Sequence, residues 1–163
     1  MTFRKFALLA IALICLAGSS SQTAQPTDGQ VRIIGDQAIA ALATQNKIVV
    51  INFWATWCEP CVEEIPVLIK LHKQYSKVKW VGISMDDSDQ QAEVQKFAAA
   101  HHMDYELYLR NGSKFEDMVN SMDPDWIGGL PATFVFRDGK RVYSKVGEIT
   151  QQELEHQLRT LLE

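Results

Sequence analysis

The stretch that decides the fold is Val50-Ile51-Asn52-Phe53-Trp54-Ala55-Thr56-Trp57-Cys58-Glu59-Pro60-Cys61. It starts inside a continuous β-branched run, Ile48 to Ile51, which is typical of a central strand covered on both faces. A helical pattern follows from Cys58 to about Tyr75, and Pro66 inside it predicts a kink. The two cysteines therefore stand where a buried strand gives way to a helix.

This position suits Cys58 and Cys61 to redox chemistry. The first turn of a helix offers unpaired N–H groups and the positive end of the helix dipole, and both stabilise a thiolate. We expect Cys58 to attack as the thiolate and the more shielded Cys61 to resolve the mixed disulfide. Pro60 fixes φ early in the helix, where its missing N–H costs little. The sequence has no second Cys-x-x-Cys pair, so we expect no metal, and no cofactor besides the redox-active pair.

Shorter elements extend outward from this stretch. Strands are predicted at Val31–Ile34, Lys79–Ser84, Tyr105–Leu109, Ala132–Phe136 and Arg141–Val146. Further helices are predicted after Gly35-Asp36, at about Gln90–His101, at Ser113–Ser121 and after Thr150, which has Glu153 as its capping-box partner. We interpret Asp86, Asp87 and Asp89 as helix-capping residues, because a Ca²⁺ loop would need a Gly and a terminal Glu. The order predicts an α/β fold, a mixed central sheet flanked by helices on both faces.

The N-terminus has the pattern of an export signal. Arg4 and Lys5 precede an apolar run, residues 6–17, that is short for a membrane span of about 20 residues. We predict a signal at residues 1–19 with cleavage after Ser19, an uncleaved anchor being the alternative, then a linker at 20–30 and one domain at 31–163. Cys15 lies within the signal, which leaves two cysteines in the mature protein. The net charge of −4 gives no reason to expect a nucleic-acid partner.

The quoted stretch resembles the active-site strand and loop of thioredoxins. Pro66 is similar to their helix-kinking proline, and Leu130-Pro131-Ala132-Thr133-Phe134 resembles their cis-proline segment. Glu-Pro between the cysteines, Asn52, the export signal and the long stretch from Met85 to Asp125 resemble the TlpA/ResA branch. The resemblance implies a thioredoxin fold with an N-terminal β-α extension and an insertion between the active-site helix and the cis-proline.

For the site, the resemblance implies a cis Leu130–Pro131 bond standing against the cysteine pair, which would form a redox-active disulfide. Main-chain groups of Leu130 would then pair with an extended client segment. Trp57 would shield the disulfide. Trp126 would form one wall of the client groove or belong to the core, and the sequence leaves both open.

Asn52 departs from cytosolic thioredoxins, which have a buried Asp there that accepts a proton. Asn cannot take a proton at neutral pH. Glu59, between the cysteines, is the nearest replacement, and its charge would raise the pKa of Cys58. Alternatively, Glu59 is a solvated residue of the first helical turn, favoured by the dipole.

The activity implied is that of an exported dithiol reductase acting on client proteins, such as apocytochrome c before haem attachment, with electrons from a membrane thiol relay. A disulfide-donating oxidant of the same fold remains an alternative, because direction depends on reduction potential.

A Sco-type copper module is a further alternative, but such proteins have three residues between the cysteines and a distant His. Here only His101 and His102 could serve, and both are also explained by a helix end. The sequence does not show the Thr-x-x-Cys-type pocket of peroxidases.

Overall fold

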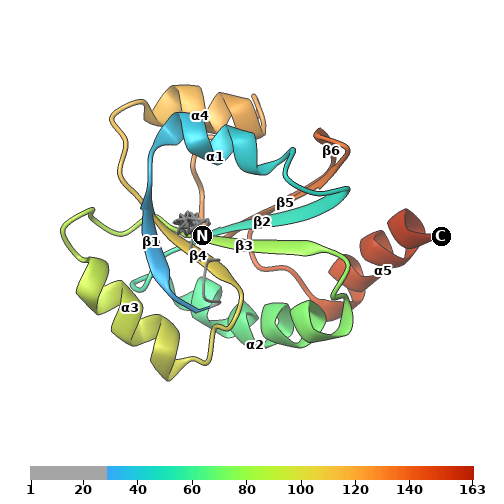
Figure 1. The fold of residues 1–163 in the computed structure, drawn as a ribbon, viewed down its shortest axis with the longest axis horizontal. Helices are drawn as coiled ribbons and strands as arrows, with labels where there is room; N and C mark the ends of the chain where they lie inside the picture. The colour runs from blue at the N-terminus through green and yellow to red at the C-terminus, as the bar shows by residue number, and fades with distance from the viewer. Residues whose placement is uncertain (1–28) are drawn as a thin grey trace, which may run out of the picture.

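A six-stranded mixed sheet lies at the centre of the computed structural model, which describes residues 29–163 (Figure 1). The strands are β1 (Val31–Ile34), β2 (Ile48–Trp54), β3 (Lys79–Ser84), β4 (Glu106–Arg110), β5 (Ala132–Arg137) and β6 (Lys140–Val146). Their order across the sheet is β1-β4-β3-β2-β5-β6. The first four in this order are mutually parallel, whereas β5 is antiparallel to both of its neighbours. The predicted export signal and most of the linker, residues 1–28, lie outside the described residues.

Helices cover both faces of the sheet, as predicted. They are α1 (Asp36–Leu42), α2 (Glu59–Gln74), α3 (Gln91–Ala100), α4 (Phe115–Met122) and α5 (Gln151–Leu162). Figure 1 shows α1 and α4 on one face and α2, α3 and α5 on the other. None of these helices is both long and apolar enough to cross a membrane, a finding that concerns residues 29–163 alone. The predicted elements are all present, with ends that differ by a residue or two.

The β-branched run forms the central strand because both of its faces are covered. All seven residues of β2 are buried. Val50 and Trp54 pack into the cluster under α2, α3 and α5, while Ile51 and Phe53 pack into the cluster under α1 and α4. Each such side chain contributes about 1.5–3 kcal/mol when fully buried. Strand β2 therefore anchors both cores and fixes the position of the loop that follows it.

Two helix starts test the predicted caps. Thr150 and Glu153 form the expected capping box, in which the Thr150 hydroxyl accepts from the Glu153 N–H and the Glu153 carboxylate accepts from the Thr150 N–H. Of the predicted pair Gly35-Asp36, Gly35 is the N-cap residue of α1, and Asp36 makes no side-chain capping bond. Its carboxylate instead accepts hydrogen bonds from Arg110 Nε at 2.6 Å and from the Lys114 N–H at 2.7 Å. The carboxylate therefore joins α1 to Arg110, the last residue of β4, and to the loop between β4 and α4.

Candidate active site

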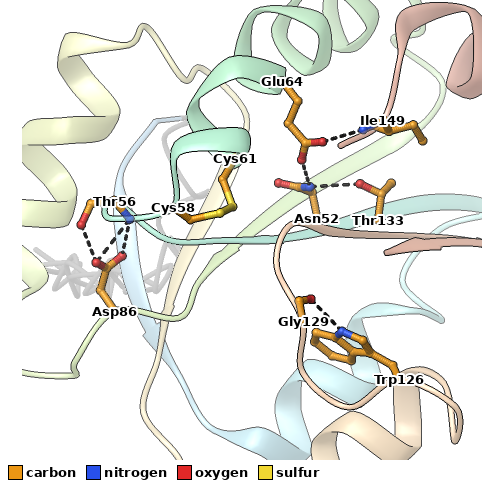
Figure 2. The surroundings of a disulfide bond; sticks show 10 residues. All are labelled: Asn52, Thr56, Cys58, Cys61, Glu64, Asp86, Trp126, Gly129, Thr133 and Ile149. Carbon is orange, nitrogen blue, oxygen red and sulfur yellow. Dashed lines mark hydrogen bonds between the residues drawn. A yellow bond between two sulfur atoms is a disulfide. The ribbon is translucent and has the colours of Figure 1, made fainter. Parts of the chain in front are cut away.

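Cys58 and Cys61 form a disulfide at the N-terminus of α2, directly after the loop that follows β2 (Figure 2). Cys58 is the N-cap residue, and Cys61 lies in the first turn of the helix. Cys58 is 6% exposed and Cys61 is 0% exposed. Pro60 occupies the second helical position, where no intrahelical partner exists for the missing N–H. This placement confirms the expected strand-to-helix context, and the exposures favour Cys58 as the attacking sulfur.

The peptide bond between Leu130 and Pro131 is cis, as the thioredoxin resemblance implied. Pro131 directly precedes β5, whose first residue, Ala132, pairs with Phe53 near the end of β2. The Pro131 carbonyl accepts from the Gly147 N–H at 2.8 Å, and this bond joins the end of β6 to the cis-proline loop. Leu130 packs against the cluster that contains both cysteines. The cis-proline loop and the disulfide loop therefore lie at one edge of the sheet.

Glu64, which the sequence pattern did not single out, carries a buried carboxyl group one turn after Cys61 in α2. Glu64 is 1% exposed, and its two oxygens accept from Asn52 Nδ2 at 2.7 Å and from the Ile149 N–H at 2.9 Å (Figure 2). Asn52 Nδ2 also donates to Thr133 Oγ1 at 3.0 Å. Glu64 thus joins α2 to β2 and to the loop before α5, and Asn52 extends this network to β5.

Burial raises the pKa of Glu64 to about 7, an effect that the hydrogen bonds from Ile149 and Asn52 only partly oppose. The charge of Glu148 raises this pKa further. A carboxyl group that titrates near neutral pH can accept and return a proton under working conditions. Glu64 follows Cys61 by three residues and lies on the same face of α2.

A carboxyl group with a pKa near neutral is therefore present at Glu64, hydrogen-bonded to Asn52. Asn52 cannot take the proton, but its amide orients the carboxyl group that can. The signal was present in the sequence, since Glu64 interrupts the apolar stripe that runs from Cys61 through Ile65 to Leu68. A polar residue on the buried face of a helix calls for a chemical explanation, because such groups are rarely buried without a partner.

Comparison with known proteins identifies the family. The sequence model of the AhpC/TSA family matches residues 24–145, well over half of the chain. The chain belongs to the AhpC/TSA family.

Individual relatives agree with this family and with the predicted TlpA/ResA branch. The chain is 29% identical over 118 residues to the thiol-disulfide oxidoreductase ResA of Bacillus cereus, covering 72% of this chain and 65% of that protein. It is 27% identical over 139 residues to the thioredoxin-like protein YneN of Bacillus subtilis, covering 82% and 76%. The chain thus spans somewhat less than two thirds of the ResA relative.

Solved structures confirm the thioredoxin fold. A thioredoxin-related protein of Neisseria meningitidis serogroup B aligns with a TM-score of 0.62 and 26% identity, covering 72% of this chain and 87% of that one. A DsbF homologue from Corynebacterium diphtheriae aligns with a TM-score of 0.63 and 25% identity, covering 72% and 73%.

In this AhpC/TSA-family chain, the predicted site residues Trp57 and Glu59 both lie at the surface. Trp57 is 69% exposed beside Cys58, so most of its indole is available to a client. Glu59 is exposed in the first turn of α2, which agrees with the solvated alternative. Because Glu64 is buried next to Cys61 in the helix and titrates near neutral pH, it is better suited than Glu59 to receive the proton.

Trp126 belongs to the core. It is 3% exposed and packs against Phe53 and Phe134, with ring centroids 4.7 Å and 5.1 Å away. Its Nε1 donates to the Gly129 carbonyl at 2.9 Å, so it supports the cis-proline loop from within (Figure 2). It reaches the surface only as part of the lining of a groove of about 350 Å³ beside α4. The exposed neighbour is Ile127, at 92%.

The predicted capping role of the three aspartates is wrong. The N-cap residue of α3 is Gln90, with no side-chain capping bond. Asp86 is instead buried, and its carboxylate accepts hydrogen bonds from Thr56 in the active-site loop and from Ser84 at the end of β3. Asp87 and Asp89 are exposed.

His101 and His102 lie at the C-terminal end of α3, as one alternative expected. His101 stacks on Phe97 with ring centroids 4.2 Å apart. Since α3 returns the chain from β3 to the parallel strand β4, this end lies at the sheet edge opposite the disulfide. Within residues 29–163, no group of three or more His, Cys, Asp or Glu side chains is arranged to hold a metal ion. The structure therefore gives the copper alternative no ligand set within that range.

Proposed function

We propose that this protein is an exported thiol–disulfide oxidoreductase that works as a dithiol reductase of client proteins. The observation that carries the proposal is the Cys58–Cys61 pair at the start of α2, with Glu64 buried one turn further along the same face. The ResA relative, named a thiol-disulfide oxidoreductase, supports the reaction class.

The proposed reaction starts from the reduced pair. The Cys58 thiolate attacks one sulfur of a client disulfide, and the second client sulfur leaves as a thiolate. Cys61 then gives its proton to Glu64 and attacks Cys58 Sγ. This step closes the Cys58–Cys61 disulfide and releases the first client sulfur as a thiolate. The client gains two electrons and the protein loses two, so an external dithiol must reduce the pair again.

The charges close in sequence to the cysteines support the reducing direction. Residues 54–66 contain Glu59, Glu63 and Glu64 but no Lys, Arg or His. Carboxylates disfavour a neighbouring thiolate, and there is no cation in this stretch to offset them. A strong oxidant of this fold depends on a very stable thiolate in its reduced form. Here the reduced form gains less stability from its thiolate than a strong oxidant does. The disulfide is therefore harder to reduce, and the dithiol is the better electron donor.

The surface around the pair suits an extended apolar client segment. Trp57, next to Cys58, and Ile127, four residues before Pro131, are both strongly exposed. The groove beside α4 adds Phe115, Val119 and Pro124 to its lining. Main-chain pairing at Leu130 would fix the backbone of the segment, and apolar contacts would select its side chains. In line with the TlpA/ResA resemblance, we infer that apocytochrome c before haem attachment is a client and that a membrane thiol relay outside the cytoplasm supplies the electrons.

A single-turnover assay tests the proposal. Reduced protein is mixed with an equimolar disulfide-bonded client peptide that contains a Cys-x-x-Cys-His segment, the reaction is quenched with acid, and free thiols are alkylated and weighed by mass spectrometry. We expect oxidised protein and reduced peptide to appear together, with more than half of the peptide reduced at equilibrium. Cys58→Ser protein is the control and should reduce none. Net transfer in the opposite direction, from oxidised protein to reduced peptide, would contradict the reductase assignment.

A further inference from the structure

A second buried carboxylate lies on the other side of the disulfide loop from Glu64. Asp86, 5% exposed, follows β3 directly. Its oxygens accept from the Thr56 N–H at 3.1 and 3.3 Å, from the Thr56 hydroxyl, and from Ser84 Oγ at 2.6 Å (Figure 2). The three donor groups account for the burial of this acid, since a carboxylate is costly to bury without hydrogen bonds.

Thr56 lies within the turn that presents Cys58. The Cys58 N–H donates to the Ala55 carbonyl at 3.2 Å, which closes the turn around Thr56 and Trp57. On the other side, the Met85 N–H donates to the Trp54 carbonyl at 2.8 Å. Asp86 therefore joins the end of β3 to the turn just before the attacking sulfur, and it does so through both the main chain and the side chain of Thr56.

The carboxylate of Asp86 binds the turn that contains Thr56 and makes no hydrogen bond to the start of α3, the helix that follows it in the chain. The N-cap residue of α3 is Gln90, four residues further on, and the exposed Asp87 is the residue whose N–H binds Gln90. An acid serving only the start of α3 would lie nearer that helix and would not need Thr56. The side chain of Ser84 in turn accepts from the Asp86 N–H at 3.1 Å, so the carboxylate itself is held in place.

We propose that Asp86 is a positioning residue for thiol–disulfide exchange, an inference that rests on the proposed function. By binding the main-chain N–H and the hydroxyl of Thr56, it holds the turn that keeps Cys58 at the N-cap of α2. It also directs both donors of Thr56 to its own carboxylate, so that they do not stabilise a thiolate at Cys58. Loss of this carboxylate slows exchange with a client and makes the thiolate easier to form.

Three variants of the full chain separate these effects. Asp86→Asn removes the charge at nearly constant shape, Asp87→Asn removes an equal charge from the exposed neighbour, and Thr56→Val removes one donor while leaving the carboxylate. For Asp86→Asn we expect the Cys58 pKa, read from the pH dependence of alkylation, to fall by at least half a pH unit. The equilibrium constant with glutathione should shift at least threefold toward the reduced form. Asp87→Asn should change each quantity by less than half as much.

Thr56→Val provides the test of the turn if Asp86→Asn fails to fold. We expect this variant to reduce the client peptide at least threefold more slowly than wild type while melting within a few degrees of it. Wild-type rates in Thr56→Val, or equal effects of Asp86→Asn and Asp87→Asn on the Cys58 pKa, would overturn the proposal. Either result would leave the proposed function intact, because that function fails only when the wild-type protein does not reduce the peptide in a Cys58-dependent manner.

Discussion

The first turns of α2 carry one carboxyl group on the solvent side of the helix and another on the buried side. Glu59 lies between the cysteines and is exposed, whereas Glu64 lies beyond them and is buried. Five residues correspond to about 140° around a helix, so these side chains point to nearly opposite sides. Closeness in sequence to the cysteines is therefore a poor guide to which carboxyl group can take part in proton transfer. The helical face decides, because burial beside Cys61 moves the pKa of Glu64 toward neutral.

The largest expected effect separates the two cysteines themselves. Cys58→Ser should abolish exchange, because the attacking sulfur is gone. Cys61→Ser should still attack and should accumulate mixed disulfides with the client, because nothing resolves them. Non-reducing gels and mass spectrometry of the trapped species measure both. Faster alkylation of Cys61 than of Cys58 in the reduced protein would reverse the assignment.

The next effect concerns Glu64 as the acceptor of the Cys61 proton. Glu64→Gln should slow resolution of the mixed disulfide by about a hundredfold at about pH 8, the lower end of the range for general base catalysis. The wild-type rate of resolution should rise with pH around a pKa of about 7, and this rise should be absent from the pH profile of the variant. Glu63→Gln, an exposed neighbour on the same turn, is the matched control and should retain the wild-type profile. The same pH profile in Glu64→Gln as in wild type would remove Glu64 from the reaction.

Burial of Glu64 should also make the stability of the oxidised protein depend on pH. The folded-state pKa of about 7 lies above the ordinary value of 4.5, so the folded protein binds the proton more tightly than the unfolded chain. This contribution is fully present below pH 4.5 and is lost as pH rises through 7, which amounts to roughly 3 kcal/mol of unfolding free energy.

Urea denaturation at several pH values measures this dependence. Relative to wild type, Glu64→Gln should flatten the curve between pH 4.5 and 7, whereas Glu63→Gln should not. Parallel curves for wild type and Glu64→Gln would show that the buried carboxyl does not titrate in this range.

The smallest effect is expected at Glu59. Glu59→His replaces the opposing charge by a neutral or cationic group, so the Cys58 pKa should fall. The reduction potential should rise by tens of millivolts, where 30 mV corresponds to about 1.4 kcal/mol. Equilibration with glutathione measures the shift. An unchanged potential would mean that Glu59 has no part in setting the direction, and would make the contrast with the buried carboxyls sharper.

The sequence predicted the parts of the fold that depend on local pattern. The β-branched run at Ile48–Ile51 and the Thr150–Glu153 capping box both produced the expected elements. The cis bond at Pro131 followed from the thioredoxin resemblance. These features are encoded by neighbouring residues or by a motif, so a single sequence is enough to find them.

Long-range partners were beyond reach of the sequence. The position of Asp86 before a helix predicts a helix cap, but its partner Thr56 is 30 residues away. Trp126 could have been groove or core until β5 placed Phe134 beside it. The role of Glu64 depends on Asn52 and on the Ile149 N–H, which come from β2 and from the loop before α5. Each of these cases concerned a polar or aromatic side chain whose role depends on tertiary neighbours.

The reduction potential of the Cys58–Cys61 pair tests the central claim most directly. The stretch around the pair, residues 54–66, carries three Glu and no Lys, Arg or His, and it predicts a dithiol that donates electrons. Equilibration of the oxidised protein with a series of glutathione buffers, quenched with acid and quantified by alkylation, gives the value. We predict a potential nearer the roughly −270 mV of thioredoxin than the roughly −120 mV of DsbA. A value above about −180 mV, that of protein disulfide isomerase, would contradict the reductase assignment.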